Sequence, residues 1–524
     1  QKDVCLLHGV TSSGKTELYI KLMKEQLEKG KQVLYLLPEI ALTTQIIKRL
    51  RSHFGNKVGT THSHISNSER VEVWRAVQEK ENKKLSYPVI IGARSSLFLP
   101  FDNLGLIIVD EEHDMSFKQQ NPAPRYHARD TAIYLASLHK SKVLLGSATP
   151  CLETYYNVSK GKFSLVEMNQ RFAQIELPDI NTVDIRKAHL KKQMQYHFSP
   201  NLIESISESL DLGKQVILFQ NRRGYSPVIS CVYCSYTPNC RSCDVSLTYY
   251  KWNNSLKCHY CGYTEEIPNE CPSCKCKEFS DEGFGTEQIE ESLGQLFPNY
   301  VAKRLDYDTT RRKYAYQKII SDFEQGRIDI LVGTQMVTKG LDFDNVSLVG
   351  ILNADSMFNF PDFRSYEKAF QLLIQVSGRA GRKEMKGKVL VQTFDEEKEI
   401  FTMLKDYDYK TFINKQLAER KLFLYPPYAR LIGITLKHKN QNKLDNAAKK
   451  LAVIMRNSFG NRVLGPEYPY ISKIRNYYHK SLLLKIEHKS SIRNAKELLR
   501  MIIDNFSSHS EFKAIRIVID VDLL

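Results

Sequence analysis

Residues 6–18, LLHGVTSSGKTEL, establish the class of the fold. Gly9 to Thr16 matches the pattern G-x-x-x-x-G-K-[ST], with an apolar segment before it and a helical pattern, ELYIKLMKEQLEKG, after it. This strand–loop–helix order is what a phosphate-binding loop needs, because backbone N–H groups and a helix N-terminus hold the phosphate oxygens. The sequence therefore predicts ATP or GTP binding by Gly9, Val10, Thr11, Ser12, Ser13, Gly14, Lys15 and Thr16. Lys15 would reach the β- and γ-phosphates, and the Thr16 hydroxyl would hold Mg²⁺.

Two further apolar segments end in polar residues that suit nucleotide chemistry. Residues 103–117, NLGLIIVDEEHDMSF, place Asp110, Glu111, Glu112 and His113 at the tip of a strand. Alone, such a run is usually a solvated strand end. Downstream of a phosphate loop, the first carboxylate is expected to position Mg²⁺, and the second to orient or deprotonate the attacking water. Residues 142–150, KVLLGSATP, end another strand with the hydroxyls of Ser147 and Thr149, which suit sensing of the neighbouring site.

A second α/β pattern follows a break near 165–198. Its strands are expected in GKQVILFQNRRGYSP (213–227) and in the segment from Arg327 to Asp355. The helix SYEKAFQLLIQVSGRAGR (365–382) ends in Gln375, Arg379 and Arg382. The two arginines could merely complement the helix dipole. Their spacing also suits arginine fingers that reach the γ-phosphate across a cleft.

GVTSSGKT, DEEH, GSATP, GTQMVTKGLDF and QVSGRAGR, in this order, resemble motifs I, II, III, V and VI of superfamily 2 helicases. The resemblance implies two tandem RecA-like lobes with ATP between them. It assigns catalysis to Lys15, Asp110, Glu111, Arg379 and Arg382, and Mg²⁺ to Thr16 and Asp110. It adds Gly340 and Gln375 to the ATP-binding residues, and it gives His113, Ser147 and Thr149 a part in coupling hydrolysis to movement on DNA.

Further segments resemble one family within this superfamily. LLPEIALT (36–43), SFKQQNPAPRYHARDTAIYLA (116–136), GFGTEQIEESL (283–293) and ADSMFNFPDFRSYEK (354–368) are similar to the PriA family of primosomal replication-restart helicases, as is a cysteine block inside lobe two. The resemblance implies an ATP-dependent 3′→5′ DNA helicase that recognises stalled or branched forks and starts primosome assembly. The alternative is a DNA-stimulated ATPase that acts mainly as a loading platform, with unwinding secondary.

The same resemblance implies partners and a location. The partners would be branched and single-stranded DNA, primosome proteins, single-strand DNA-binding protein and the loader of the replicative helicase, with no membrane. The protein would be cytoplasmic, bacterial and nucleoid-associated. The chain does not begin with Met, so we expect a fragment that lacks the N-terminal region in which the family is thought to bind the 3′ end at a fork. The loop GLDFD, with Leu341 and Asp342, departs from the family pattern, so DNA contacts there stay open.

Aromatic and basic residues alternate after DEEH, as single-stranded DNA binding requires. We expect DNA contacts from Phe117, Lys118, Arg125, Tyr126 and Arg129, and from Arg94 in GARSSLFLP. The alternative is a loop that only covers lobe one. Ile133 and Tyr134, in the helix that follows, are expected in the core.

Eight of the eleven cysteines form four C-x-x-C knuckles with the spacing C-x2-C-x5-C-x2-C-x14-C-x2-C-x9-C-x2-C. Two knuckles can complete one tetrahedral Zn–S₄ site, so two closed, structural Zn²⁺ sites are expected. We favour a nested pairing, in which Cys240, Cys243, Cys258 and Cys261 form one site and Cys231, Cys234, Cys271 and Cys274 form the other. Sequential pairing and iron–sulfur ligation are the alternatives. The hairpin near Trp252 could contact DNA, a partner protein or the ribbon itself.

The net charge and the order of strands and helices complete the prediction of domains and partners. The net charge of +16 favours polyanionic partners, although a solvated Lys-rich surface would give the same value. The order of strands and helices after residue 421 indicates a ferredoxin-like β-α-β-β-α-β domain, whose basic stretch SKIRNYYHKS could bind DNA. The predicted domains are lobe one (1–165), a connector (166–198), lobe two (199–395) with a zinc insertion (229–280), a helical connector (396–420) and a C-terminal α+β domain (421–524).

Overall fold

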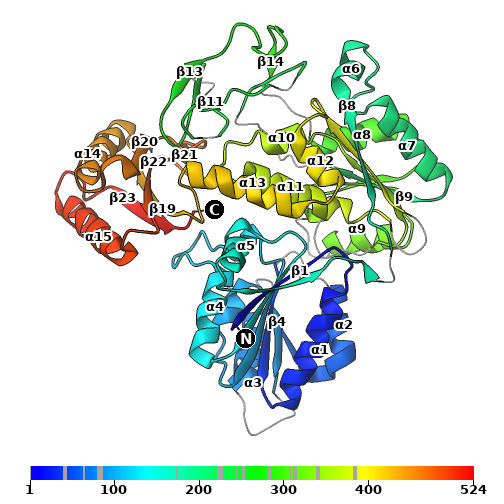
Figure 1. Cartoon of the computed structure of the whole chain (residues 1–524), viewed down its shortest axis with the longest axis horizontal. Helices are drawn as coiled ribbons and strands as arrows, with labels where there is room; N and C mark the ends of the chain where they lie inside the picture. Colours follow the sequence, from blue (N-terminus) through cyan, green and yellow to red (C-terminus); the bar gives the residue numbers. More distant parts are fainter. Residues whose placement is uncertain are drawn as a thin grey trace.

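The computed structural model describes residues 2–38, 44–62, 65–78, 86–172, 175–220, 228–234, 236–243, 245–250, 254–280, 285–306, 309–310, 315–337, 343–381 and 386–523. Two α/β lobes form the centre of the molecule, with lobe one below lobe two in Figure 1. The C-terminal domain, in orange and red, lies to one side, and the cysteine-rich module lies next to it at the top. Within the described ranges, no helix is long and apolar enough to cross a membrane.

Lobe one is a parallel sheet of seven strands, in the order β3-β4-β2-β5-β6-β1-β7. The central strand β5 is apolar and buried along nearly its whole length, as expected of a strand covered on both faces. The strands are β1 (Val4–Gly9), β2 (Gln32–Leu36), β3 (Val58–Thr61), β4 (Val89–Gly92), β5 (Leu104–Asp110), β6 (Lys142–Ser147) and β7 (Ser164–Met168). The helices are α1 (Lys15–Glu28), α2 (Thr44–Phe54), α3 (Asn67–Gln78), α4 (Ala128–His139) and α5 (Leu152–Ser159).

Lobe two repeats this plan with six parallel strands, in the order β15-β16-β9-β17-β18-β8. They are β8 (Asp179–Asp184), β9 (Gln215–Phe219), β15 (Ala302–Leu305), β16 (Ile330–Gly333), β17 (Val346–Ile351) and β18 (Lys388–Thr393). The helices are α6 (Ile185–Leu190), α7 (Pro200–Asp211), α8 (Thr286–Leu296), α9 (Ala315–Glu324), α10 (Asp355–Phe358) and α11 (Ser365–Ser377). α7 begins after Ser199, whose side chain accepts a hydrogen bond from Leu202 N, with Pro200 in its first turn.

The expected connector at 166–198 is the main difference from the sequence-based domain outline. β7 runs to Met168 and pairs with β1 of lobe one, while β8 pairs with β18 at the edge of the lobe-two sheet. Both are edge strands with mostly exposed or half-buried residues, so their apolar signal is weak. The chain therefore passes from lobe one to lobe two between Met168 and Asp179.

The cysteine-rich module inserts into lobe two between β9 and α8. It contains a pair of short antiparallel strands, β10 (Ser230–Cys231) and β14 (Phe279–Ser280), where the chain enters and leaves. A three-stranded antiparallel sheet lies beyond them, formed by β11 (Thr248–Tyr250), β12 (Ser255–Lys257) and β13 (Thr264–Glu266). Trp252 lies outside the described residues, so the expected role of the hairpin tip stays open.

Two helices lead from lobe two to the C-terminal domain, namely α12 (Glu399–Lys405) and α13 (Tyr409–Leu422). Their apolar faces belong to the core of lobe two, and α13 runs between the lobes in Figure 1. The C-terminal domain follows the predicted order with one further short strand, β21: β19 (Ala429–His438), α14 (Gln441–Phe459), β20 (Val463–Glu467), β21 (Lys473–Ile474), β22 (Tyr477–Glu487), α15 (Ile492–Ser508) and β23 (Arg516–Val521). Its main sheet, β20-β22-β19-β23, is antiparallel and packs against both helices.

Candidate nucleotide site and metal centres

The phosphate loop lies between β1 and α1, as predicted. Gly9 needs to be glycine, because a Cβ there would lie 2.7 Å from Ser13 Oγ. Lys15 folds back over the loop and donates to the carbonyls of Gly9 (2.7 Å) and Val10 (3.2 Å). Burial lowers the pKa of Lys15, and Glu111 and Asp110 oppose that shift. Within the described chain, the buried hydroxyl of Ser13 has no hydrogen-bond partner, which suits a loop that closes around phosphate oxygens.

The carboxylates of DEEH lie at the end of β5, beside this loop. Asp110 accepts hydrogen bonds from the hydroxyls of Tyr19 (3.0 Å) and Tyr35 (3.1 Å), neither of which the sequence analysis singled out. Burial and the neighbouring Glu111 raise the pKa of Asp110 to about 6, while Lys15 and the two tyrosines act against that rise. The carboxylate of Asp110 and the hydroxyl of Thr16 offer the oxygen ligands that Mg²⁺ prefers, so the residues fit this ion.

Glu111 and His113 of lobe one both contact Gln375 of lobe two. Glu111 has φ of 51°, a strained value for a non-glycine residue that is typical of functional sites. Nε2 of Gln375, on α11 of lobe two, lies 2.6 Å from His113 Nε2 and 3.4 Å from Glu111 Oε2. His113 Nδ1 lies 2.8 Å from Ser147 Oγ. Because an amide nitrogen only donates, the proton of His113 belongs on Nδ1, where it reaches Ser147.

The segment after α11 closes on the phosphate loop. A Cβ at Gly378 would lie 2.5 Å from Oγ1 of Thr11, so the absence of a side chain lets the two segments meet. Arg379 is buried beside them, and its pKa is lowered by burial and raised by Glu111. The predicted Arg382 and Gly340 lie outside the described residues.

Arg171 is a cleft residue that the sequence analysis missed. It lies in the passage between the lobes and donates to the carbonyls of Gly381 (2.9 Å) and Gly378 (3.4 Å), with a longer contact to Thr11 Oγ1 (3.5 Å). Its guanidinium therefore joins the passage, the phosphate loop and the segment that carries Arg379. A single arginine after an edge strand carries no motif that would have revealed this.

The residues expected to contact DNA divide into two groups. Phe117 is only 1% exposed and packs in the core of lobe one, so its expected stacking face is not available. Lys118 is buried and donates to the carbonyl of Val521 (2.6 Å), with an ion pair to Asp520. Arg129 pairs with the buried Glu112 (3.1 Å) and with Asp130. These three side chains are engaged within the protein in this structure, and DNA contacts from Lys118 and Arg129 stay predictions.

Arg94, Arg125 and Tyr126 remain predictions. Arg94 donates to the carbonyls of Ser116 and Lys118, which holds the loop after DEEH on lobe one. Tyr126 lies half-buried against Phe98, with ring centroids 5.0 Å apart, and Phe98 is itself 54% exposed. In the following helix Ile133 packs on the core as expected, whereas Tyr134 is 66% exposed and does not.

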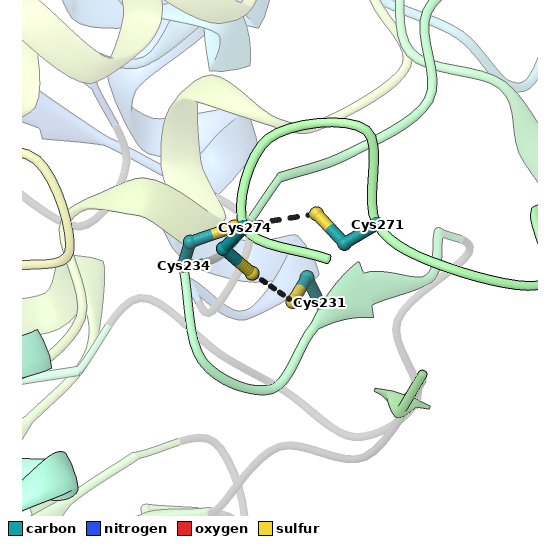
Figure 2. Close-up of side chains that lie close together, drawn as sticks. All are labelled: Cys231, Cys234, Cys271 and Cys274. Atoms are coloured by element: carbon teal, nitrogen blue, oxygen red, sulfur yellow. Dashed lines mark hydrogen bonds between the residues drawn. The ribbon is translucent and has the colours of Figure 1, made fainter. Parts of the chain in front are cut away.

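The eight knuckle cysteines form two groups with the nested pairing that we favoured. One contains Cys231, Cys234, Cys271 and Cys274 (Figure 2), and the other Cys240, Cys243, Cys258 and Cys261. In each group the sulfur atoms lie within 4.8 Å of one another, with Cys231 and Cys274 3.5 Å apart and Cys240 and Cys261 3.6 Å apart. A tetrahedral Zn–S₄ site has sulfurs about 3.8 Å apart, given Zn–S bonds of about 2.3 Å. The residues therefore fit zinc, and Cys276 is in neither group.

The two groups differ in their surroundings. The group with Cys240 packs in its own apolar cluster, and the Cys243 carbonyl accepts a hydrogen bond from Tyr425 at 2.9 Å. Tyr250 reaches the carbonyl of Tyr468, and Lys257 pairs with Glu467, so this inner group rests on the C-terminal domain. In the other, outer group Cys274 is exposed.

Curated relatives are similar to this chain in sequence over most of its length. The chain is 42% identical to the replication restart protein PriA of Bacillus subtilis (strain 168), over 100% of this chain and 64% of the relative. It is 39% identical to that of Rickettsia felis, over 93% of this chain and 74% of the relative. It is 37% identical to that of Haemophilus influenzae, over 99% of this chain and 70% of the relative. The chain belongs to the PriA family.

Models of known protein families match four regions of this PriA family member. A DEAD/DEAH box helicase model matches residues 1–158, within lobe one, and a helicase conserved C-terminal domain matches 279–384, within lobe two. The PriA DNA helicase Cys-rich region matches 240–265, the inner cysteine group. The primosomal protein N C-terminal domain matches 421–523. The chain spans 64%, 58% and 57% of the PriA relatives from Bacillus subtilis, Synechocystis and Chlamydia pneumoniae.

Proposed function

We propose that this chain is the motor of an ATP-dependent 3′→5′ DNA helicase that recognises stalled or branched replication forks and starts primosome assembly. The observation that carries the proposal is the contact of Gln375 with His113 and Glu111 across the lobes, beside Lys15. A site built from both lobes can change when the lobes move, which is what a motor requires. Membership of the PriA family supports the restart role.

Each cleft residue has a role that follows from its position. Lys15 turns from the loop carbonyls to the β- and γ-phosphates when a nucleotide enters. Glu111, in its strained conformation, orients the attacking water, and Gln375 holds its carboxylate. Arg379 reaches the γ-phosphate from lobe two, together with Arg382. When bound at Thr16 and Asp110, Mg²⁺ supplies positive charge that offsets the charge developing on the phosphates.

The His113 contacts supply a route from hydrolysis to movement. Gln375 of lobe two meets His113, and His113 meets Ser147, which also accepts a hydrogen bond from Thr149 N at 2.8 Å. Loss of the γ-phosphate releases Arg379 and with it the end of α11, so the His113–Gln375 contact changes. Arg94, Arg125 and Tyr126 contact the DNA strand on which this movement acts.

The remaining parts serve fork binding and loading. Two structural Zn²⁺ ions hold the cysteine-rich module, which rests on the C-terminal domain. The partners are branched and single-stranded DNA, primosome proteins, single-strand DNA-binding protein and the loader of the replicative helicase. The protein acts in the bacterial cytoplasm, at the nucleoid.

A strand-displacement assay on forked DNA tests this function, with the chain compared with Lys15→Ala. We expect ATP-dependent unwinding by the wild-type chain and none by the variant, with DNA binding unchanged. DNA should stimulate ATP hydrolysis more than RNA does, and DNA affinity should fall as salt rises, because phosphate contacts release counterions. ATP hydrolysis that DNA does not stimulate would contradict the proposal.

The alternative is a DNA-stimulated ATPase that acts mainly as a loading platform. Its support is that the C-terminal domain is tied to both lobes, since Lys118 of lobe one binds the Val521 carbonyl and Arg364 of lobe two binds the Leu523 carbonyl (3.0 Å). Full partner loading by the Lys15→Ala chain would favour this alternative. Loading that needs ATP-driven unwinding would favour the motor.

A further inference from the structure

Two buried tyrosines hold the carboxylate that ends β5. The Tyr19 hydroxyl, from α1, donates to Asp110 Oδ1 at 3.0 Å, and the Tyr35 hydroxyl, from β2, donates to Oδ2 at 3.1 Å. Both side chains are at most 1% exposed, and their rings pack edge to face with centroids 5.6 Å apart. One donor thus reaches each oxygen of Asp110 from two different elements, which fixes the plane of the carboxylate.

The fold leaves room for this arrangement at Gly146. Gly146 lies directly opposite Asp110 in the register of β5 and β6. A Cβ on Gly146 would lie 1.8 Å from the Tyr19 hydroxyl and 2.9 Å from its Cζ. The absence of a side chain at the start of the GSATP motif is therefore what allows the Tyr19 hydroxyl to reach Asp110.

Counting acceptor positions distinguishes the two oxygens of Asp110. Each carboxylate oxygen can accept about two hydrogen bonds. Oδ1 accepts from both Tyr19 and the backbone N–H of Glu111, at 3.0 Å and 3.1 Å. Oδ2 accepts from Tyr35. Oδ1 is therefore fully used, whereas Oδ2 keeps a lone pair for a further partner.

We infer that Tyr19 and Tyr35 are positioning residues that present Oδ2 of Asp110 to the divalent cation of the nucleotide site. This inference rests on the proposed ATP hydrolysis and names side chains that act through Asp110. Partners behind a metal ligand set its orientation, and their loss typically costs 10- to 100-fold in metal affinity or activity. A tyrosine hydroxyl has an ordinary pKa of about 10, so both phenols are donors near neutral pH.

The test removes one hydroxyl at a time with Tyr19→Phe, Tyr35→Phe and the double variant. The matched control is Tyr87→Phe, because Tyr87 also donates to a carboxylate of lobe one, Glu72 at 2.9 Å, but lies before β4 at the opposite end of the sheet. Mn²⁺ serves as the probe, with its binding to the ADP-bound chain measured by electron paramagnetic resonance. The Mg²⁺ concentration that half-saturates ATP hydrolysis is the second readout.

We expect the double variant to lose about 10- to 100-fold in Mn²⁺ affinity and to need correspondingly more Mg²⁺, with metal-free nucleotide binding unchanged. Tyr87→Phe should match the wild type. Wild-type metal affinity in the double variant would overturn the inference, even if its turnover or thermal midpoint fell. A wild-type chain that binds Mn²⁺–ADP but does not hydrolyse ATP would instead overturn the proposed function.

Gly146→Ala gives an independent check that does not remove a hydroxyl. The added Cβ displaces the Tyr19 hydroxyl, so this variant should lose Mn²⁺ affinity about as much as Tyr19→Phe does. In the Tyr19→Phe background, Gly146→Ala should then add little further loss, because both changes remove the same hydrogen bond. Fully additive losses in Mn²⁺ affinity would contradict the link between Gly146 and Asp110.

Discussion

In the nucleotide cleft, Gln375 meets His113 across 262 positions of sequence, whereas the sulfur contacts Cys231–Cys274 and Cys240–Cys261 span 43 and 21 positions. The cleft exists only when both lobes are folded and in contact. Each cysteine group needs only its own two knuckles and a metal ion. Damage in the cleft should therefore remove activity and leave the fold, whereas damage in a cysteine group should reduce stability first.

The nucleotide cleft and the cysteine groups also differ in how their residues affect stability. The cleft holds Glu111 at φ of 51°, a buried Asp110 with a raised pKa and a Lys15 with a lowered one. Strained backbone and desolvated charges cost stability, so they persist where function requires them. In the inner cysteine group three of the four cysteines are buried in an apolar cluster, and the group is tied to a neighbouring domain, an arrangement that favours permanence.

Among the four tests of this comparison that follow, Glu111→Gln is expected to reduce activity most. Loss of a general base typically costs about 10²- to 10⁴-fold in rate, so ATP hydrolysis should fall by that factor. ATP binding should persist, and the thermal midpoint should change little, because the repulsion with Asp110 that is relieved offsets the attraction to Lys15 and Arg379 that is lost. Steady-state ATPase assays and thermal unfolding measure both. A variant that keeps wild-type turnover would remove Glu111 from the mechanism.

A cysteine change should have the opposite profile. Cys258→Ser, in the buried inner group, should release about one equivalent of zinc and lower the thermal midpoint, because metal binding contributes directly to folding. Cys274→Ser, in the outer group, should also release about one equivalent but disturb the C-terminal domain less, since Cys274 is exposed. Metal analysis and thermal unfolding check this. Iron in place of zinc, or unchanged metal content in both variants, would refute the assignment.

A third change tests the contact between the two lobes at Gly378 and Thr11. Gly378→Ala places a Cβ 2.5 Å from Oγ1 of Thr11, which should move Arg379 away from the phosphate loop. Displacements of this size can cost about 10- to 100-fold in turnover. Thr11→Ala in the same chain removes two of the clashing atoms and should restore part of the rate. If the double variant were no faster than Gly378→Ala, steric contact with Thr11 would not be the cause.

The smallest effect is expected where the inner cysteine group meets the C-terminal domain. Lys257→Ala removes the ion pair with Glu467, which is partly exposed. Such pairs contribute about 0–1 kcal/mol, so thermal unfolding should change little. The matched control is Lys142→Ala, which removes the exposed pair with Asp3 in lobe one. A large loss for Lys257→Ala alone would show that this contact holds the module in place.

The features that could be predicted from the sequence are those built from residues that lie close together in the chain. The phosphate loop, the DEEH tip and the knuckles depend on residues that are close in sequence, and the nested pairing followed from the hairpin between Cys243 and Cys258. The strands β7 and β8 escaped because edge strands alternate weakly. Tyr19 and Arg171 escaped because their roles depend on tertiary contacts alone.

The packing of three residues that were expected to contact DNA escaped prediction for the same reason. Phe117, Lys118 and Arg129 have the composition of a DNA-binding loop, and only the packing shows where their side chains go. Lys118 reaches a strand 403 positions away, which no local pattern encodes. The third acidic residue of DEEH, Glu112, likewise proves structural, since it accepts hydrogen bonds from Cys151 N (2.7 Å) and Thr154 Oγ1 (2.8 Å).

The central claim is that one catalytic site forms across the two lobes. Its most direct test is single-turnover ATP hydrolysis, with DNA at saturation, by the wild-type chain and by Arg379→Ala, alongside ATP binding by each. An arginine finger contributes about 10³- to 10⁵-fold to hydrolysis, so the variant should bind ATP nearly as well as the wild type and hydrolyse it slower by that factor. Hydrolysis at the wild-type rate by Arg379→Ala would mean that lobe one acts alone, and the account would fail.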